Sequence, residues 1–366
     1  MSLKTLTYNR ILIVKLRFHG DMLLTTPLIS TLKARYPGAA IDVLLYEDTI
    51  PILSKHPDIH RLYGLKRKTA GSMEKISGFL TLRNQLKRNR YDLIVNLADQ
   101  WPIALLIKSL NCPYSLSIQR GGARQSLWRA CFTHCLEPKG QHIVEQNFSL
   151  LAPLGVPEED RTRPLSLHYG QEDAQRVFAL APELQETPYV VIQPTARQYF
   201  KCWDNDKFAQ VIDHLKQQGL EVVLTCGPGA EDLATVNDIH ALCAHKPNMS
   251  LAGKTHFLEL AALIDKAVLY IGVDSAPMHM AAALETPTVC LFGATDHRQW
   301  YPWSNNHIVI WAGDYQPIPE RHHLDRTFKY LSYIPVQDVI QATKTLLSQS
   351  ENLTSTEDKR EIRGVR

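Results

Sequence analysis

The sequence lacks the features of a membrane-spanning or secreted protein. No stretch approaches the roughly 20 apolar residues that a membrane span needs. The first apolar run, residues 11–16, is short and already contains Lys15, so it does not resemble a signal peptide. We therefore expect a soluble protein that at most binds to a membrane surface.

The sequence also lacks the pattern of a disulfide framework. The seven cysteines are scattered and odd in number, which is typical of reduced thiols in a cytoplasmic protein rather than of a disulfide framework. Cys131, His134 and Cys135 lie close together in the chain. No second ligand pair has a matching spacing, so we expect no metal site there.

A dinucleotide-binding fingerprint is missing as well. The chain has 366 residues, 45% of them hydrophobic and 21% charged, which is enough for two ordinary globular domains. Its first half alternates helices with strands expected at 10–16, 41–46, 59–63 and 92–97, a pattern that favours a parallel, doubly wound sheet. The loop after the first strand holds one glycine, Gly20, where the fingerprint needs three. An NAD-dependent oxidoreductase is therefore disfavoured.

The same loop carries a carboxylate, Asp21, directly after Gly20. Asp21 is either a plain N-cap of the following helix or a base directed into a ligand site from the carboxyl end of the strand. The two roles are compatible, and the residues alone do not separate them. We expect the following helix to run to Tyr36, with Pro27 at a kink or near its start.

Basic residues gather in the first half. Residues 61–90 hold nine Lys or Arg and one acid, and a second basic segment surrounds Arg120 and Arg124. Such runs are usually solvated faces, but two of them in a chain of net charge +3 favour an anionic ligand or an anionic membrane surface. Nucleic acid is a weaker hypothesis, because no aromatic interleaving or nucleic-acid motif accompanies them.

The second half repeats the alternation of strands and helices after a proline- and charge-rich region, residues 155–187, where we expect the domain boundary. Thr195 and Lys201 follow its first strand and are either a loop hydroxyl and a surface lysine or ligands of a diphosphate. Gly227 and Glu231 follow the next strand. One interpretation is a generic turn followed by an acid in the first turn of a helix. The other is that Gly227 lets a ligand approach the backbone closely and Glu231 accepts hydrogen bonds from ribose hydroxyls.

Residues 268–296 are the most informative stretch. A buried strand (268–273) leads into Asp274 and Ser275, then a helix of small residues and a second buried strand that ends at Gly293. A helix N-terminus at the carboxyl end of a parallel strand offers free N–H groups to a phosphate. For an isolated Asp-Ser before a helix, however, capping is the better interpretation.

This stretch, Asp-Ser-Ala-Pro-Met-His followed later by Gly-Ala-Thr-Asp, resembles the nucleotide-sugar half of the lipopolysaccharide heptosyltransferases. The similarity runs from about residue 10 to 345 and includes Val14-Lys15 through Gly20-Asp21 and Lys201-x-Trp203. The first loop has Arg-Phe-His where the family often has small hydroxyl residues. In this form it is most similar to family members that add the branching heptose of the inner core.

The resemblance implies an α/β fold of the GT-B type, with two Rossmann-like domains facing across a cleft. An acceptor-binding domain is expected at residues 1–170, a nucleotide-sugar-binding domain at 185–330, a closing helix at 331–348 and a flexible tail at 349–366. It implies ADP-heptose as the donor, a phosphorylated inner-core lipopolysaccharide as the acceptor, inversion without metal or cofactor, and a cytoplasmic enzyme bound peripherally to the inner membrane.

The resemblance also assigns roles to residues. Asp21 is the expected general base, and Lys201 is expected to stabilise charge on the departing ADP. The other expected donor-binding residues are Thr195, Gly227, Glu231, Asp274, Ser275, Ala276 and His279. Acceptor contacts are expected from the basic side chains Lys66, Arg67, Lys68, Arg120 and Arg124. Two other classes stay open, an isomerase such as a nucleotide-sugar epimerase and a non-catalytic nucleotide-sugar-binding assembly protein.

Overall fold

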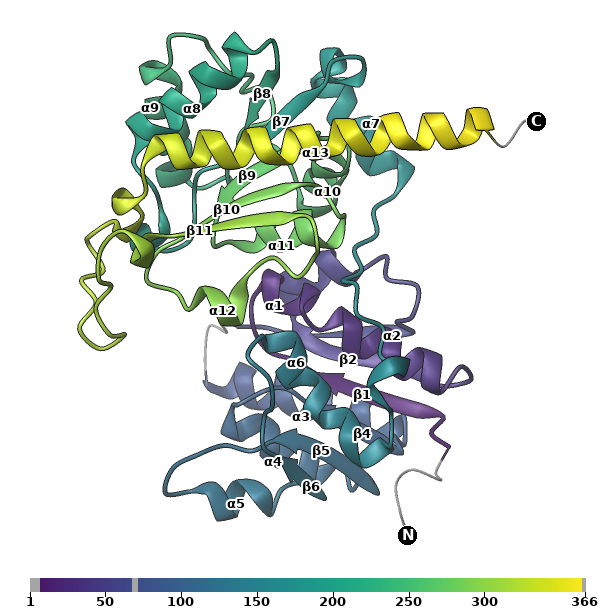
Figure 1. Ribbon diagram of the computed structural model, residues 1–366. Helices are drawn as coiled ribbons and strands as arrows, with labels where there is room; N and C mark the ends of the chain where they lie inside the picture. Colours follow the sequence, from purple (N-terminus) through teal and green to yellow (C-terminus); the bar gives the residue numbers. More distant parts are fainter. Residues whose placement is uncertain (1–6, 68–71, 364–366) are drawn as a thin grey trace. The chain divides into compact units, whose positions relative to one another are not determined.

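A computed structural model describes the backbone of residues 7–67 and 72–363 and the side chains of residues 7–67 and 77–349. The chain divides into two compact units, Met1–Ser166 and Leu167–Arg366 (Figure 1). Each unit has its own sheet and its own apolar core, and each is described by itself.

The N-terminal unit is built on a six-stranded parallel sheet in the order β3-β2-β1-β4-β5-β6. Its central strands are apolar and buried along their length, as parallel strands covered on both faces must be. The strands are β1 (Arg10–Val14), β2 (Ala40–Tyr46), β3 (Arg61–Leu65), β4 (Leu93–Asn96), β5 (Tyr114–Ile118) and β6 (His134–Leu136). The helices are α1 (His19–Leu23), α2 (Thr26–Arg35), α3 (Ser72–Arg88), α4 (Trp101–Ser109), α5 (Gln125–Arg129) and α6 (Ile143–Phe148), with the 3-10 helices η2 (Glu47–Leu53), η3 (Ser149–Leu154) and η4 (Glu158–Asp160).

The C-terminal unit has a five-stranded parallel sheet in the order β11-β10-β9-β7-β8. The strands are β7 (Tyr189–Gln193), β8 (Glu221–Leu224), β9 (Leu269–Val273), β10 (Thr288–Phe292) and β11 (His307–Trp311). The helices are α7 (Gln171–Leu180), α8 (Asn205–Gln217), α9 (Ala230–Leu242), α10 (Phe257–Asp265), α11 (Ala276–Ala283), α12 (His297–Trp300) and α13 (Val336–Arg363), with η5 (Pro182–Gln185), η6 (Tyr199–Lys201), η7 (Ala312–Asp314) and η8 (Tyr330–Tyr333).

One expectation about the elements needs correction. The helix expected to reach Tyr36 is two helices, α1 and α2, and Pro27 lies in the first turn of α2, where its missing N–H costs nothing. The division between the two units, after Ser166, lies within the region 155–187 where the boundary is expected. That region also contains α7, whose Arg176 Nε donates to Glu259 of α10 over 2.7 Å. The backbone of the segment 349–363 is helical and forms the end of α13, and the flexibility expected of this tail stays a prediction. It contains Glu, Lys and Arg but no Gly or Pro before Gly364, a composition that favours a helix.

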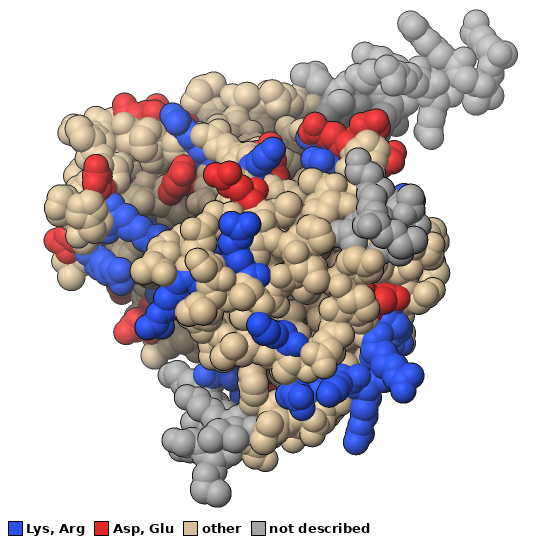
Figure 2. All heavy atoms as spheres, turned by 90° about the horizontal axis from the view of Figure 1, so that it is seen from below, with Lys and Arg blue, Asp and Glu red and all other residues tan. Residues whose placement is uncertain are grey.

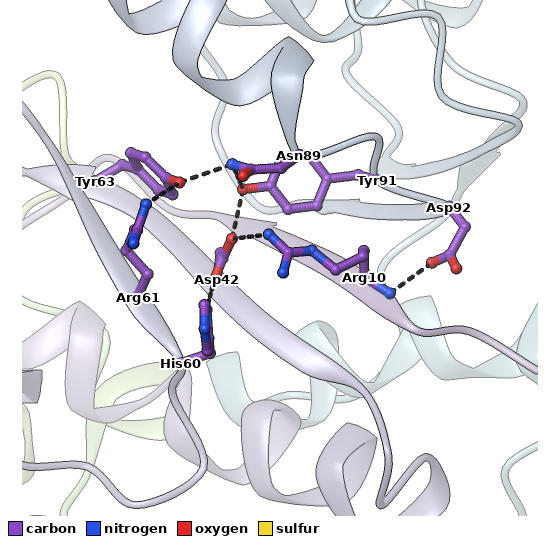
Figure 3. A network of polar contacts seen from close by, with 8 residues as sticks. All are labelled: Arg10, Asp42, His60, Arg61, Tyr63, Asn89, Tyr91 and Asp92. Atoms are coloured by element: carbon purple, nitrogen blue, oxygen red, sulfur yellow. Dashed lines mark hydrogen bonds and ion pairs between the residues drawn. The ribbon is translucent and has the colours of Figure 1, made fainter.

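A buried polar network ties the amino ends of strands β1 to β4 together (Figure 3). Asp42 of β2 is fully buried and accepts hydrogen bonds from the Tyr91 hydroxyl (2.7 Å) and, across 2.8 Å, pairs with His60 Nδ1. The Arg10 guanidinium lies 3.6 Å from Asp42, and the Arg10 amide donates to Asp92. These partners satisfy a carboxylate that would otherwise be costly to bury. The network therefore stabilises the sheet at the edge opposite to the loop that carries Asp21.

Among the helices that the structure describes, none combines the length and the apolar character that crossing a bilayer requires.

Candidate active site

The topology of each sheet identifies one edge as the place for a ligand. All strands of a sheet are parallel, so their carboxyl ends lie at one edge. The strand order reverses between β1 and β4 in the N-terminal unit and between β7 and β9 in the C-terminal unit. Ligands of open α/β sheets bind outside the carboxyl ends at such points. Asp21 follows β1, and Lys201 and Asp274 follow β7 and β9, so each unit contributes candidate residues at its own reversal point.

Asp21 lies in the first turn of α1 and is partly exposed. Its carboxylate accepts a hydrogen bond from the backbone N–H of Phe18 over 3.3 Å. The N-cap residue itself is Phe18, so Asp21 supports the helix from its third position rather than from the N-cap. The carboxylate thus has a structural bond to the loop, and this bond also fixes its direction.

Lys15 is a residue of this site to which the sequence analysis gave no role. It directly follows β1, and only 5% of its surface is exposed. Burial lowers the pKa of its ammonium group, whereas the charge of Asp21 opposes this lowering. A lysine at the end of a buried strand is a signal that the sequence does contain, because lysine is almost never fully buried without a reason.

The expected acceptor-binding cations lie in different environments. Lys66 and Arg124 are exposed, and Lys68 lies outside the described residues. The Arg120 guanidinium donates to the backbone carbonyl of Asp99 over 2.5 Å and lies over the rings of Trp101 and Trp128.

Arg67 is already held by protein groups, since its Nε donates to the carboxylate of Asp48 over 2.8 Å. In the lower right part of the face drawn in Figure 2, Lys and Arg side chains gather with few Asp or Glu among them, whereas the upper part carries both signs of charge. The N-terminal basic segments therefore offer positive charge, but some of the predicted acceptor-binding side chains, such as Arg67, already pair with groups of the same chain.

The candidate residues of the C-terminal unit centre on an ion pair. Lys201 Nζ lies 2.6 Å from Asp274 Oδ2, and the carboxylate is almost buried. Lys201 comes from η6 and Asp274 from the residue after β9, so two segments 73 positions apart in the sequence meet here. The structure thus brings together the two residues that the sequence placed in separate loops.

Thr195 belongs to a second, buried chain of hydrogen bonds. Its hydroxyl accepts from Gln193 Nε2 over 3.0 Å, and Gln193 in turn accepts from Thr225 over 2.7 Å. Asp232 also hydrogen-bonds with Thr195, although burial, the larger effect, raises the pKa of the Asp232 carboxyl group. A Cβ at position 227 would lie 2.6 Å from Asp232 Oδ2, so any other residue there would require the Asp232 carboxylate to shift. Glu231 is exposed, and the acid that reaches Thr195 is Asp232, which the sequence analysis did not name.

Helix α11 begins beside the ion pair. Ser275 is its N-cap residue, but the Ser275 side chain makes no capping bond, and Ala276 and Pro277 form the first turn. His279 is buried in the same helix. An α-helix leaves its first N–H groups without intrahelical partners, so this end can receive a phosphate next to Lys201. The described residues hold no group of three or more His, Cys, Asp or Glu side chains arranged to bind a metal, and the metal-independent reaction stays a prediction.

Comparison with known proteins identifies the family. The model of glycosyltransferase family 9 (heptosyltransferase) matches residues 79–331. Lipopolysaccharide heptosyltransferase 3 of Escherichia coli (strain K12) is 54% identical over 336 residues, which cover 91% of this chain and 97% of that protein. The chain belongs to glycosyltransferase family 9. Two predictions from the sequence are thereby confirmed: the heptosyltransferase family and the glycosyltransferase class of enzyme.

Solved structures confirm the GT-B fold of this family 9 glycosyltransferase. A family 9 glycosyl transferase from Veillonella parvula DSM 2008 has a TM-score of 0.82 at 24% identity, covering 95% of this chain and 99% of that one. The E. coli ADP-heptose lps heptosyltransferase II has a TM-score of 0.73 at 25% identity, covering 93% and 99%. Both matches span nearly the whole chain, so both units belong to the shared fold.

Proposed function

We propose that this family 9 enzyme transfers a heptose from ADP-heptose to the inner core of lipopolysaccharide, at the step that adds the third, branching heptose. The observation that carries the proposal is the 54% identity to lipopolysaccharide heptosyltransferase 3 over 97% of that protein. The neighbouring step is less favoured, because lipopolysaccharide heptosyltransferase 2 of E. coli (strain K12) is 27% identical. An isomerase or a non-catalytic binding protein has no comparable support.

The reaction proposed for the site is an inverting displacement. The Asp21 carboxylate takes the proton of the acceptor hydroxyl, and the oxygen attacks the anomeric carbon of the heptose. The bond from that carbon to the diphosphate oxygen breaks, and ADP leaves from the opposite face. A general base at this step is worth about 10²- to 10⁴-fold in rate.

The departing diphosphate needs compensation for its charge. Lys201 supplies a cation and the N-terminus of α11 supplies free N–H groups, and such preorganised charges are often the largest single contribution to catalysis. In the proposed complex Asp274 contacts heptose hydroxyls, Thr195 and His279 lie near the phosphates, and an acid of α9 binds the ribose. Asp232 is a candidate for that acid beside Glu231, because its carboxylate already reaches the phosphate-side hydroxyl of Thr195.

We also propose that the enzyme works at the cytoplasmic face of the inner membrane as a peripheral protein. Its acceptor is anchored in a membrane, and the N-terminal unit carries basic segments that suit an anionic surface. Co-sedimentation with vesicles that contain anionic lipid tests this localisation, and failure to bind at low salt contradicts it.

Mass spectrometry of a purified core acceptor that carries two heptoses and a phosphate, after incubation with enzyme and ADP-heptose, tests the reaction. A gain of one heptose supports the proposal. Consumption of ADP-heptose without a gain in acceptor mass indicates an isomerase or a hydrolase. Bound but unconsumed ADP-heptose, with several core acceptors tried, indicates a binding protein.

The base is tested by Asp21→Asn and Asp21→Ala. The asparagine keeps an oxygen that can accept the Phe18 N–H bond but cannot take a proton, so we expect both variants to lose transfer and to bind ADP like the unmodified enzyme. Calorimetric titration with ADP measures the second point. Transfer by Asp21→Asn at more than about a tenth of the original rate contradicts a general-base role.

A further inference from the structure

The side chain of Arg67 is enclosed by other protein groups. It follows the end of β3, and 27% of the side chain is exposed. Its Nε donates to both oxygens of Asp48, over 3.0 and 2.8 Å. The guanidinium carbon lies 3.8 Å from the centre of the Tyr46 ring and 4.5 Å from that of the Phe18 ring. The guanidinium of Arg67 is therefore already engaged in an ion pair with a carboxylate and in cation–π contacts with two rings.

The remaining contact reaches the loop that precedes Asp21. Arg67 Nη2 donates to the backbone carbonyl of Arg17 over 2.6 Å. The segment Arg17 to His19 is thus held at three successive residues, by a hydrogen bond to the carbonyl of Arg17, by the stacked ring of Phe18, and by the 2.9 Å contact of His19 Nε2 with the carbonyl of Asp48.

The held segment is connected directly to the proposed base. The backbone N–H of Phe18, the residue whose ring lies against Arg67, donates to the Asp21 carboxylate. A shift of the Phe18 backbone would therefore shift or release the carboxylate. Misplacement of a reacting group by about 1 Å can cost on the order of 100-fold in rate.

We propose that Arg67 is a positioning residue, which holds the loop Arg17–His19 so that the Asp21 carboxylate faces the acceptor hydroxyl. This inference rests on the proposed role of Asp21. It differs from the expectation that Arg67 binds an anionic group of the acceptor, because the partner of the guanidinium is Asp48 of the same chain. We call the set Arg67, Asp48, Tyr46, Phe18 and the Arg17 carbonyl the Arg67 clamp.

Arg67→Ala and Asp48→Asn separate the two roles through the steady-state constants for the acceptor. If the clamp positions Asp21, both variants lower kcat about 10- to 100-fold and leave the acceptor KM within about twofold. If Arg67 binds an acceptor anion, Arg67→Ala raises the acceptor KM. Asp48→Asn then frees the cation and lowers KM, with kcat unchanged. This second pattern overturns the proposal.

Two further variants sharpen the comparison. Arg67→Lys keeps the charge but loses the planar fork and the stacking, so it should not restore kcat, whereas it should largely restore an electrostatic acceptor contact. Arg61→Ala is the matched control, because Arg61 also lies over a tyrosine ring but stands at the start of β3, whereas Arg67 follows its end. We expect it to leave kcat and KM unchanged.

Hydrogen exchange gives a readout that does not need the reaction. Amides of residues 16–22 should exchange at least about tenfold faster in Arg67→Ala and Asp48→Asn, because removing local contacts makes local opening more frequent. Their exchange rates should be unchanged in Arg61→Ala. If the unmodified enzyme transfers no heptose but the two variants still show faster exchange, the proposed function is refuted and the clamp is retained. Unchanged exchange in both variants overturns the clamp even where transfer is lost.

Discussion

At the scale of single residues, the pair Lys201–Asp274 would combine a stabilising role with a functional one in the proposed reaction. The two groups meet at 2.6 Å beside the start of α11. Asp274 is nearly buried, so its charge depends on Lys201 for compensation. A diphosphate that arrives next to Lys201 adds negative charge, and the ammonium can then serve the ligand as well as the carboxylate. The pair holds the lysine in place before the ligand binds, which reduces the entropy lost on binding.

Lys201→Met should lower transfer by about 10² to 10³-fold, since this is the usual effect of removing one preorganised charge from a reaction centre. It should also weaken ADP binding, which distinguishes it from the Asp21 variants. Steady-state transfer and calorimetric titration with ADP measure the two effects.

Lys216→Met is the matched control for Lys201→Met. Lys216 pairs with Glu221 at 2.8 Å, and its side chain is 23% exposed, as is that of Lys201. Glu221 starts β8, at the edge of the sheet away from the ligand loops. Equal losses of transfer in the two variants would show that Lys201 acts only through folding.

The limits of sequence analysis are clearest for Arg67 and Asp232. Both are polar residues in loops or first helical turns, where many side chains simply face solvent. What distinguishes them is a partner 19 or more positions away, Asp48 for Arg67 and Thr195 for Asp232. No local pattern encodes such a pair. Asp274 and Lys201 were recognisable because each stands in a motif that resembles a known family.

At the scale of elements, the sequence predicted eight of the strands that the structure describes and missed β5, β6 and β11. β7 and β10 are buried at every residue, and they lie where the first strand of the second half and the strand that ends at Gly293 were expected. β5 was missed because Ser115 and Ser117 occupy buried positions, where Ser117 accepts a hydrogen bond from Asn96. β6 has three residues, and β11 is a partly exposed edge strand. Tertiary pairing rather than local pattern forms these strands.

If the enzyme docks on an anionic bilayer as proposed, we expect helices α4 and α5 to form the docking surface. Leu105 and Leu127 are exposed on them, and the chain has no Asp or Glu between Asp99 and Glu137. Lys108 of α4 donates to the carbonyl of Ala130 just after α5, over 2.9 Å, so the two helices are neighbours. Apolar side chains beside cations are the usual composition of membrane-surface elements.

The double variant Leu105→Gln/Leu127→Gln should bind vesicles with anionic lipid about tenfold more weakly, because exposed leucines gain by leaving water. Added salt should weaken the binding of the unmodified protein, since the charges are screened. Leu180→Gln/Leu242→Gln is the control, with exposed leucines on α7 and α9. Equal binding of both double variants would refute α4 and α5 as the docking surface.

At the scale of the whole molecule, both units hide ionisable groups in their neutral form. Burial raises the pKa of the Cys112 thiol, in the N-terminal unit, to about 12. Burial likewise raises the pKa of Cys226 and of Cys243, in the C-terminal unit, from 9.0 to about 11. Burial raises the pKa of several tyrosine hydroxyls too: Tyr8, Tyr36, Tyr91, Tyr169, Tyr189, Tyr270 and Tyr315. Lys15 acts in the opposite direction, because its pKa is lowered by burial.

These shifts predict a loss of stability in alkali. Below pH 9 the thiols are protonated in both the folded and the unfolded chain. Between pH 9 and about 11 the unfolded thiols of Cys226 and Cys243 lose a proton that the folded ones keep, so the unfolded state gains. Each such thiol raises the unfolding constant by up to about tenfold per pH unit in that window. Lys15 adds stability with rising pH, but it is one group against several.

Urea unfolding between pH 7.5 and 10.5, with a reductant present, measures this loss. The double variant Cys226→Ala/Cys243→Ala should be less stable at pH 7.5, since it leaves small cavities in a packed core. That cost does not depend on pH. Above pH 9 the unfolding free energy of the double variant should fall less steeply with pH than that of the unmodified protein, because up to about two fewer protons are released on unfolding. A decline as steep as that of the unmodified protein would show that these two thiols do not stay protonated in the folded state.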